Sequence, residues 1–345
     1  MKQWSAFLLS GLMAVSLTAC GGGSSPSAGT SGMETNEQAT ANYPQKPIVV
    51  VAPSGAGGGW DRTARTFVKV LAESKLVEKT MTVENKPGGG GTVFLADYVS
   101  RESKNDYKLF AGSPPVLINN LKKEGNSPYG YQDTTPLAQL TKDFGSIVVR
   151  ADSKYNDLTS LIDDLKADPT KITFAGGSGP GSMYHLVSIL PAYKSGADHK
   201  SVKYVSYDGT GEAMAALLGG NADVIASDAS SILEYLKAGK IRVLAVASQD
   251  RLEGELKDVP TMREQGVDAE FAIWRGIFGP KEMSEDALSF WNKKIKQMVE
   301  TENWKKAIRE NGWESDYKNA NEFKAFLDEQ NKQIHELLAA LDMAK

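Results

Sequence analysis

The sequence predicts an α/β protein with two domains. From residue 46 onward, short apolar strand patterns alternate with helical patterns, an order typical of mostly parallel sheets with crossover helices. Two of these strands lead directly into glycine-rich loops that are followed by amphipathic helices. About 300 residues follow Tyr43, which is enough chain for two domains with cores of their own.

The first glycine-rich loop spans residues 53–59 and follows an apolar strand over residues 48–52. The helix after it has apolar residues at helical spacing, and Asp61 suits its N-cap. A helix start presents unpaired N–H groups and the positive end of the helix dipole, and glycines let the backbone close around a ligand. The loop therefore predicts an anion-binding site.

A second loop of this kind spans residues 176–182, between a strand over 171–175 and a helix that begins near Met183. Either loop alone could equally be a tight turn, but two loops in matching positions predict one anionic ligand held from both sides. Neither loop fits the phosphate-loop or the dinucleotide-binding pattern. Because no lysine or arginine lies inside either loop, we expect a carboxylate rather than a phosphate.

Further elements follow the same alternation. Strands are expected over residues 81–85, 108–113, 146–150, 202–207, 223–226, 241–246 and 271–278. Helices are expected over residues 93–99, 158–167, 214–218 and 231–238, and the chain after 278 is expected to be wholly helical. Gly112 and Ser113 end the third strand, at the edge where open α/β sheets bind ligands.

The N-terminus has the pattern of a secretory signal. Lys2 precedes an almost wholly apolar run over residues 6–19, which is too short for a permanent bilayer span. Residues 17–21 resemble a bacterial lipobox, so we expect residues 1–19 to be a signal peptide and Cys20 to carry a lipid. The alternative is a buried structural cysteine. Residues 20–45 are rich in Gly, Ser and Thr, which predicts a flexible tether to the bilayer.

Composition narrows the function classes. Cys20 is the only cysteine, which excludes a disulfide within the chain. The formal net charge is −4 and the chain has no basic run, so no nucleic-acid partner is expected. No second apolar stretch reaches bilayer length.

An enzyme is the first alternative. Ser182 and His185 lie three residues apart on one helix face, as a hydrolase pair would, but no G-x-S-x-G elbow is present. We expect His185 to face solvent. No pair of histidines has metal-ligand spacing, and there is no second cysteine for zinc. The sequence therefore predicts no catalytic residues, no metal and no cofactor.

Several separated motifs follow one another in a specific order and spacing. They are residues 53–61 with Arg65, and 84–89, 177–182, 207–211, 219–223, 238–246, 259–266 and Trp274. Together they resemble the substrate-binding proteins of bacterial tripartite tricarboxylate transporters, also called the Bug family, and the resemblance covers residues 43–341.

The resemblance implies a two-lobed periplasmic-binding-protein fold of type II. One lobe would comprise residues 46–143 plus 272–345 and the other residues 144–271, with hinge crossings near Phe144 and Ala272. Such a protein is monomeric and extracytoplasmic, closes on a small di- or tricarboxylic or related organic acid, and delivers it to a permease with one large and one small membrane subunit. Trp60 departs from the family, which often has a small residue there, so an indole at the mouth would restrict or stack against the ligand.

The candidate ligand-binding residues come from both loops and from neighbouring strand ends. They are Ser54, Gly55, Ala56, Gly57, Gly58, Gly59, Trp60, Asp61, Gly112, Ser113, Gly177, Ser178, Gly179, Gly181, Ser182, Tyr207, Gly209, Thr210 and Asp228.

Among these candidates, the hydroxyls of Ser178, Ser182, Tyr207 and Thr210 are the expected side-chain contacts, although Tyr207 is equally a core residue at a strand end. Asp61 and Asp228 would repel a carboxylate. We expect Asp61 to cap its helix or order a water, and Asp228 to cap the helix that follows it. A sensor that presents its closed form to a signalling partner is the second alternative function.

Overall fold

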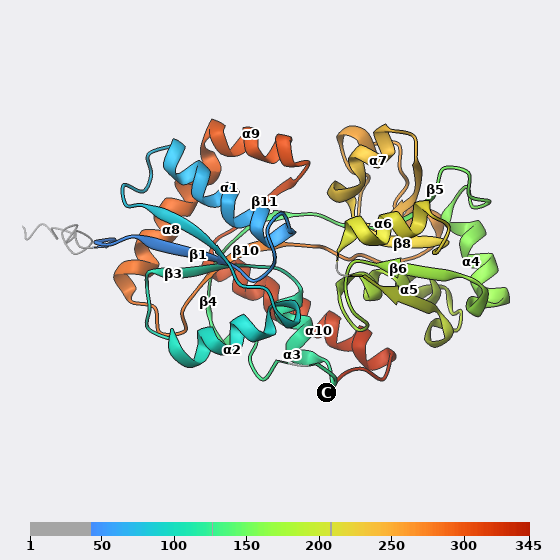
Figure 1. The fold of residues 1–345 in the computed structure, drawn as a ribbon, viewed down its shortest axis with the longest axis horizontal. Helices are drawn as coiled ribbons and strands as arrows, with labels where there is room; N and C mark the ends of the chain where they lie inside the picture. The colour runs from blue at the N-terminus through green and yellow to red at the C-terminus, as the bar shows by residue number, and fades with distance from the viewer. Residues whose placement is uncertain (1–42, 126, 208) are drawn as a thin grey trace, which may run out of the picture. The chain divides into compact units, whose positions relative to one another are not determined.

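The computed structural model describes residues 43–125, 127–207 and 209–345. The expected signal peptide, Cys20 and nearly all of the expected tether lie outside this part of the chain. The described residues form two β-sheets, each with helices on both faces (Figure 1). None of the helices within these residues has both the length and the apolar character that a bilayer crossing requires.

The first sheet has six strands in the order β11-β4-β10-β3-β1-β2. They are β1 (Ile48–Ala52), β2 (Met81–Asn85), β3 (Lys108–Gly112), β4 (Thr135–Lys142), β10 (Arg275–Gly279) and β11 (Glu314–Lys318). β1 runs parallel to β2 and β3, whereas β10 runs antiparallel to β3 and β4, and β11 antiparallel to β4. The sheet is therefore mixed, because β10 enters it from the opposite end.

Helices cover both faces of this sheet. They are α1 (Gly59–Glu73), α2 (Thr92–Arg101), α3 (Pro115–Leu121), α8 (Glu285–Glu300), α9 (Glu302–Asn311) and α10 (Ala320–Ala340). Val50 of β1 packs with Phe67 and Trp291 from α1 and α8, whereas Val51 packs with Phe94 of α2 on the other face. This alternation is the two-residue period of a strand with two buried faces.

The second sheet has five strands in the order β7-β6-β8-β5-β9. They are β5 (Gly145–Arg150), β6 (Thr173–Gly176), β7 (Lys203–Ser206), β8 (Val224–Asp228) and β9 (Ile241–Val246). β6 is parallel to β7 and β8, and β5 is antiparallel to β8 and β9. The helices here are α4 (Leu158–Ala167), α5 (Met183–Ser195), α6 (Thr210–Leu218) and α7 (Leu233–Lys237).

The chain passes between the sheets twice, from β4 to β5 and from β9 to β10. The two crossings pair with each other: the Asp143 N–H donates to the Ile273 carbonyl at 3.0 Å and the Ile273 N–H donates back at 2.7 Å. Phe144 and Ala272 form an isolated antiparallel bridge beside them. The two connections therefore form a short hydrogen-bonded ribbon.

Two expectations about the last part of the chain are wrong. Residues 314–318 form β11 rather than helix, and the strand expected over 271–278 begins only at Arg275. β11 is an edge strand whose exposed and half-buried residues lack apolar alternation, so its sequence gave no strand signal. The first residues of the expected strand belong instead to the second crossing. There, Phe271 and Ile273 form backbone hydrogen bonds with Gly145 and Asp143 of the first crossing.

The first sheet is tightly packed at Gly276 of β10. A Cβ added there would lie 2.5 Å from Cζ of Phe323 and 2.9 Å from the Ala138 carbonyl oxygen. At Gly279 of the same strand, the added Cβ would press on the flexible end of Met283 and otherwise make an ordinary contact with Leu137. We expect Gly276→Ala to lower the free energy of unfolding by about 1–3 kcal/mol, and Gly279→Ala to lower it much less. Urea unfolding measures both, and equal losses would contradict this account.

Candidate functional site

The first glycine loop leaves the start of α1 accessible. α1 begins at Gly59, and its N-cap Gly58 has no side chain to accept hydrogen bonds from the first turn. Gly55, Ala56 and Gly57 are exposed, and a Cβ added at Gly55 or Gly57 would have no described atom within 4 Å. N–H groups of the first turn of α1 are thus available to a ligand.

Asp61 is not the N-cap of α1; it lies in the first turn, because the glycines let the helix begin at Gly59. Its buried carboxylate accepts hydrogen bonds from Gly57 N (2.8 Å), Asn85 Nδ2 (2.8 Å) and Arg65 Nε (2.9 Å). Burial acts to raise the pKa of Asp61, but these hydrogen bonds outweigh it and the pKa is lowered. Asp61 therefore holds the loop in place, and its charge is already compensated.

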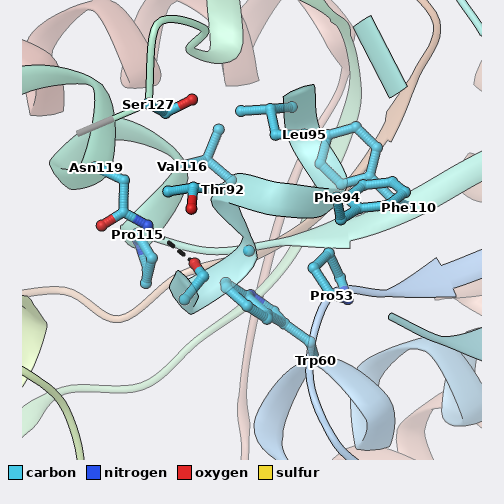
Figure 2. A pocket seen from close by; sticks show the side chains of 12 residues that line it. Pro53, Trp60, Thr92, Phe94, Leu95, Phe110, Pro115, Val116, Asn119 and Ser127 are labelled. Atoms are coloured by element: carbon cyan, nitrogen blue, oxygen red, sulfur yellow. Dashed lines mark hydrogen bonds between the residues drawn. The ribbon is translucent and has the colours of Figure 1, made fainter. Parts of the chain in front are cut away.

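Trp60 turns toward the carboxyl end of β3. Its indole Nε1 donates to Ser113 Oγ at 2.8 Å, and Ser113 is buried. The ring lies so close to Gly91 that an added Cβ there would be 3.1 Å from it. Figure 2 shows Trp60 beside Pro53 at an apolar pocket of about 290 Å³, counting its open mouth, between α2, α3 and the sheet.

Gly112, the other candidate at this strand end, has a packing role. A Cβ added there would lie 2.5 Å from Cε2 of Phe278. Its small size therefore allows β3 and β10 to approach each other.

Arg275 is a functional candidate that sequence reasoning missed. It is the first residue of β10 and only 7% exposed. Its guanidinium lies against the start of α1, because a Cβ added at Gly59 would be 2.7 Å from Nη2. No lysine or arginine lies inside the first loop, but Arg275 brings a cation to its end from a distant part of the chain. A single arginine inside an apolar segment was the available signal, since a buried charge needs a partner.

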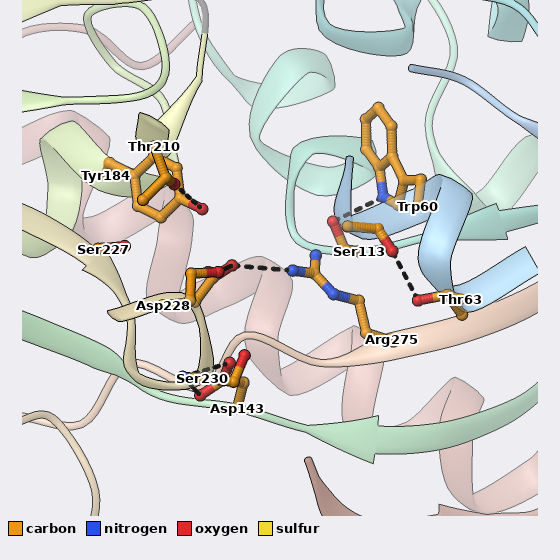
Figure 3. Close-up of polar contacts among 12 residues, drawn as sticks. Trp60, Thr63, Ser113, Asp143, Tyr184, Thr210, Ser227, Asp228, Ser230 and Arg275 are labelled. Atoms are coloured by element: carbon orange, nitrogen blue, oxygen red, sulfur yellow. Dashed lines mark hydrogen bonds and ion pairs between the residues drawn. The ribbon is translucent and has the colours of Figure 1, made fainter. Parts of the chain in front are cut away.

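Asp228 is that partner. Arg275 Nη2 donates to Asp228 Oδ2 at 3.3 Å, which joins the first sheet to the end of β8 (Figure 3). Asp228 occupies the N-cap position of the 3₁₀ turn Ala229–Ile232, but its side chain caps no backbone N–H there. It accepts instead from Ser231 Oγ at 3.2 Å. The expected capping role is wrong, because the carboxylate turns toward the guanidinium.

Asp143, at the first crossing, is a second carboxylate beside this pair. It is buried and accepts hydrogen bonds from Phe144 N at 2.7 Å and Ser230 N at 3.2 Å. Burial and, after it, the negative charge of Asp228 raise the pKa of Asp143 to about 6. Arg275 is thus paired with Asp228, and Asp143 at the crossing lies near enough for the charge of Arg275 to lower its pKa in part (Figure 3).

The second glycine loop satisfies its own polar groups. Ser182 Oγ donates to Ser178 Oγ at 2.7 Å, and the Ser178 carbonyl accepts from Tyr204 at 2.8 Å. Gly181, with a φ of +69°, packs near Met343 beyond α10. Gly179 is exposed and has no described atom within 4 Å of an added Cβ. Within the described residues, no hydrogen bond joins this loop to residues 53–59.

The start of α6 lies against the second loop. A Cβ added at Gly177 would be 2.4 Å from backbone atoms of Gly209 and Thr210. Thr210 Oγ1 meets the Tyr184 hydroxyl at 3.5 Å, and the pKa of buried Tyr184 is raised by desolvation and then by the charge of Asp228. Thr210 thus reaches the Arg275–Asp228 pair through Tyr184, whereas half-buried Tyr207 packs against the apolar core of the second sheet.

The serine–histidine pair does not have the geometry of a hydrolase. His185 is buried rather than solvent-facing, and its Nδ1 accepts from Gly181 N at 2.9 Å. Burial lowers the pKa of His185 to about 4. Ser182 Oγ is engaged by Ser178 and by the Gly179 carbonyl. In the described ranges, no group of three or more His, Cys, Asp or Glu side chains is arranged to hold a metal ion.

The sequence of this chain is similar to those of known proteins. A family model described as the tripartite tricarboxylate transporter family receptor matches residues 64–343. The protein BugT of Bordetella pertussis is 29% identical over 267 residues, which cover 75% of this chain and 78% of BugT.

Solved structures share the fold. The periplasmic binding protein BugD is 25% identical with a TM-score of 0.74, covering 88% of this chain and 100% of BugD. The MatC protein of Rhodopseudomonas palustris, solved with bound malate, is 21% identical with a TM-score of 0.73, covering 86% of this chain and 100% of MatC.

Two glycines of the second loop form a matched test. Gly177→Ala would press a Cβ into the backbone of Gly209 and Thr210, whereas Gly179→Ala would place it in open space. We expect Gly177→Ala to lower the free energy of unfolding by about 1–3 kcal/mol, and Gly179→Ala to leave it nearly unchanged. Urea unfolding of both variants is the measurement, and a stable Gly177→Ala protein would refute the close contact between the loops.

Asp143 predicts a pH dependence of stability. Its pKa is raised in the folded state from 3.8 to about 6, so the folded state binds the proton more tightly and loses stability as the pH rises through this range. One pKa unit corresponds to about 1.4 kcal/mol, so the penalty is on the order of 3 kcal/mol above the folded pKa.

The Asp143→Asn variant isolates this effect, because the other carboxyl groups cancel in the difference from the wild type. We expect the stability advantage of the variant over the wild type to grow as the pH rises from about 4 to about 6, and to stay nearly constant above that. Thermal unfolding across this range measures the difference, and a pH-independent difference would show that Asp143 ionises normally.

Proposed function

Since the chain belongs to the tripartite tricarboxylate transporter receptor family, we propose that it is an extracytoplasmic solute-binding protein, not an enzyme, that captures a small carboxylate for a membrane permease. The permease would consist of one large and one small subunit. The malate in the MatC structure supports a carboxylate as the ligand class.

One observation carries the proposal: the open start of α1 and the buried guanidinium of Arg275 lie against each other. Both are positive, because the helix start has unpaired N–H groups and the positive end of its dipole. A bound carboxylate would relieve their mutual repulsion and accept hydrogen bonds from both. Hydrogen bonds to a charged group contribute on the order of 2 kcal/mol each, so a few of them support a micromolar affinity of roughly −8 kcal/mol.

The two sheets would belong to two lobes, residues 46–143 plus 272–345 and residues 144–271, which close around the ligand. The paired crossings support this division, because a two-stranded ribbon can bend as a hinge while its hydrogen bonds persist. Closure would exclude water and strengthen the hydrogen bonds to the carboxylate. Ser54, Ser113, Thr210 and Trp60 would line the cleft between the lobes.

Anchoring on the extracytoplasmic face of the membrane would come from a lipid on Cys20, after removal of residues 1–19. The apolar run before Cys20 and the polar residues after it support this arrangement. The segment between Cys20 and β1 would then allow the binding lobes to reach the permease.

A thermal-shift screen of mono-, di- and tricarboxylates tests the proposed ligand class, and a double variant tests the site. We expect at least one acid to raise the Tm, and Gly58→Val with Gly179→Val to abolish that shift while circular dichroism shows an intact fold. Ala325→Val, on the exposed surface of α10, is the control and should keep the shift. No shift with any acid would refute carboxylate binding, and an unchanged shift in the double variant would refute the role of the loops.

A further inference from the structure

We propose that the ligand carries a hydrogen-bond donor, a hydroxyl or an ammonium group, in addition to its carboxylate, and that Asp228 binds this donor. The inference rests on the proposed function and narrows its substrate class. It separates hydroxy and amino acids from unsubstituted carboxylic acids.

The Asp228 carboxylate has one oxygen that the described chain leaves without a partner. Asp228 is 5% exposed, and its Oδ2 accepts from Arg275 and Ser231. Its Oδ1 is buried and has no hydrogen-bond partner among the described residues. Leaving a buried charged acceptor unpaired is costly, so this oxygen favours a ligand that brings a donor.

The other buried carboxylates of this region are satisfied. Asp61 accepts from Gly57, Arg65 and Asn85, and Asp143 accepts from Phe144 N and Ser230 N. Of these three carboxylates, only Asp228 has an oxygen with no donor. Asp228 therefore differs from Asp61 and Asp143, whose hydrogen bonds within the protein stabilise a loop and a crossing.

Tyr184 is the protein group that competes most directly for this oxygen. Asp228 contributes to the raised pKa of Tyr184, so the two groups lie near each other. The Tyr184 hydroxyl accepts from Thr210 Oγ1 at 3.5 Å. It also lies close enough to the Asp228 carboxylate for a side-chain contact with it to raise the pKa of Tyr184, but this contact falls short of hydrogen-bond geometry at Oδ1. Asp228 Oδ1 can accept a hydrogen bond from a polar ligand group, and the Tyr184 hydroxyl can either donate one to it or accept one from it (Figure 3).

The position of Asp228 relative to the start of α1 determines which ligand groups can bind beside it. Nη2 of Arg275 lies against Gly59 on one side and against Asp228 on the other, so a single guanidinium separates the helix start from the carboxylate. A small acid whose carboxylate sits at the helix start would thus present its other groups to Asp228. A second carboxylate there would meet a like charge, whereas a hydroxyl or ammonium group would be attracted.

Isothermal titration calorimetry with two matched series of acids tests the inference. One series is propionate, lactate and alanine, and the other is succinate, malate and aspartate, which differ only in the donor on the second carbon. In the series that binds, we expect the wild type to prefer a donor-bearing acid over the unsubstituted one by about tenfold or more. Asp228→Asn should reduce this ratio to near one, because the negative charge that attracts the donor is lost.

Asp152→Asn is the matched control, because it removes an exposed carboxylate just after β5 in the same sheet and should keep the wild-type ratio. Asp228→Ser, which retains a small polar side chain, is the second variant should Asp228→Asn fail to fold. Equal affinities for substituted and unsubstituted acids in the wild type would overturn the inference and leave carboxylate binding intact. An unchanged ratio in the Asp228 variants would overturn the role of Asp228. If no acid of either series binds, the inference fails together with the binding of these acid classes.

Discussion

The ion pair between Arg275 and Asp228 is the contact on which the candidate site depends. It joins the first strand residue after the second crossing to the last residue of β8, and both side chains are nearly inaccessible to solvent. Taking two charges out of water is expensive, and a buried pair often contributes little net stability. The pair matters here because of where it holds its two groups: the guanidinium lies at the start of α1, and the carboxylate lies on the other side of the guanidinium.

The charges around this pair are unequally satisfied. The Asp61 carboxylate is surrounded by donors and has a lowered pKa, whereas burial and Asp228 raise the pKa of Asp143. The difference follows from local geometry: Asp61 gains an arginine and an amide of its own, but Asp143 must share the field of Arg275 with a second carboxylate. The first loop is therefore held firmly by a charged group, while the crossing retains a carboxyl poised to change its protonation state.

The two glycine loops, which look alike in sequence, have different surroundings. The first has exposed glycines and a helix start that no side chain caps, so N–H groups of the first turn of α1 remain available. The second hydrogen-bonds within itself, packs on Gly209 and Thr210, and touches Met343 near the C-terminus. The C-terminal segment also reaches this sheet through Lys200 and Asp342, whose charged groups are 2.5 Å apart. The second loop thus belongs to the contact between the two sheets as much as to a binding site.

Local patterns in the sequence were sufficient for the α/β class, most strands and helices, and the glycine loop that opens at α1, because each depends on residues close together in the chain. The family resemblance, confirmed by the match over residues 64–343, added the binding-protein fold. The edge strand β11 lacked an apolar pattern, and the helix start at Gly59 moved Asp61 out of its expected cap.

Only the tertiary structure decided that Arg275 stands beside Gly59, that Asp228 faces it, and that His185 is buried and accepts a hydrogen bond from Gly181. These residues are far apart in sequence or turn in directions that no local period encodes. Their partners are selected by the return of β10 into the first sheet, and by the need of each buried charge for an opposite one.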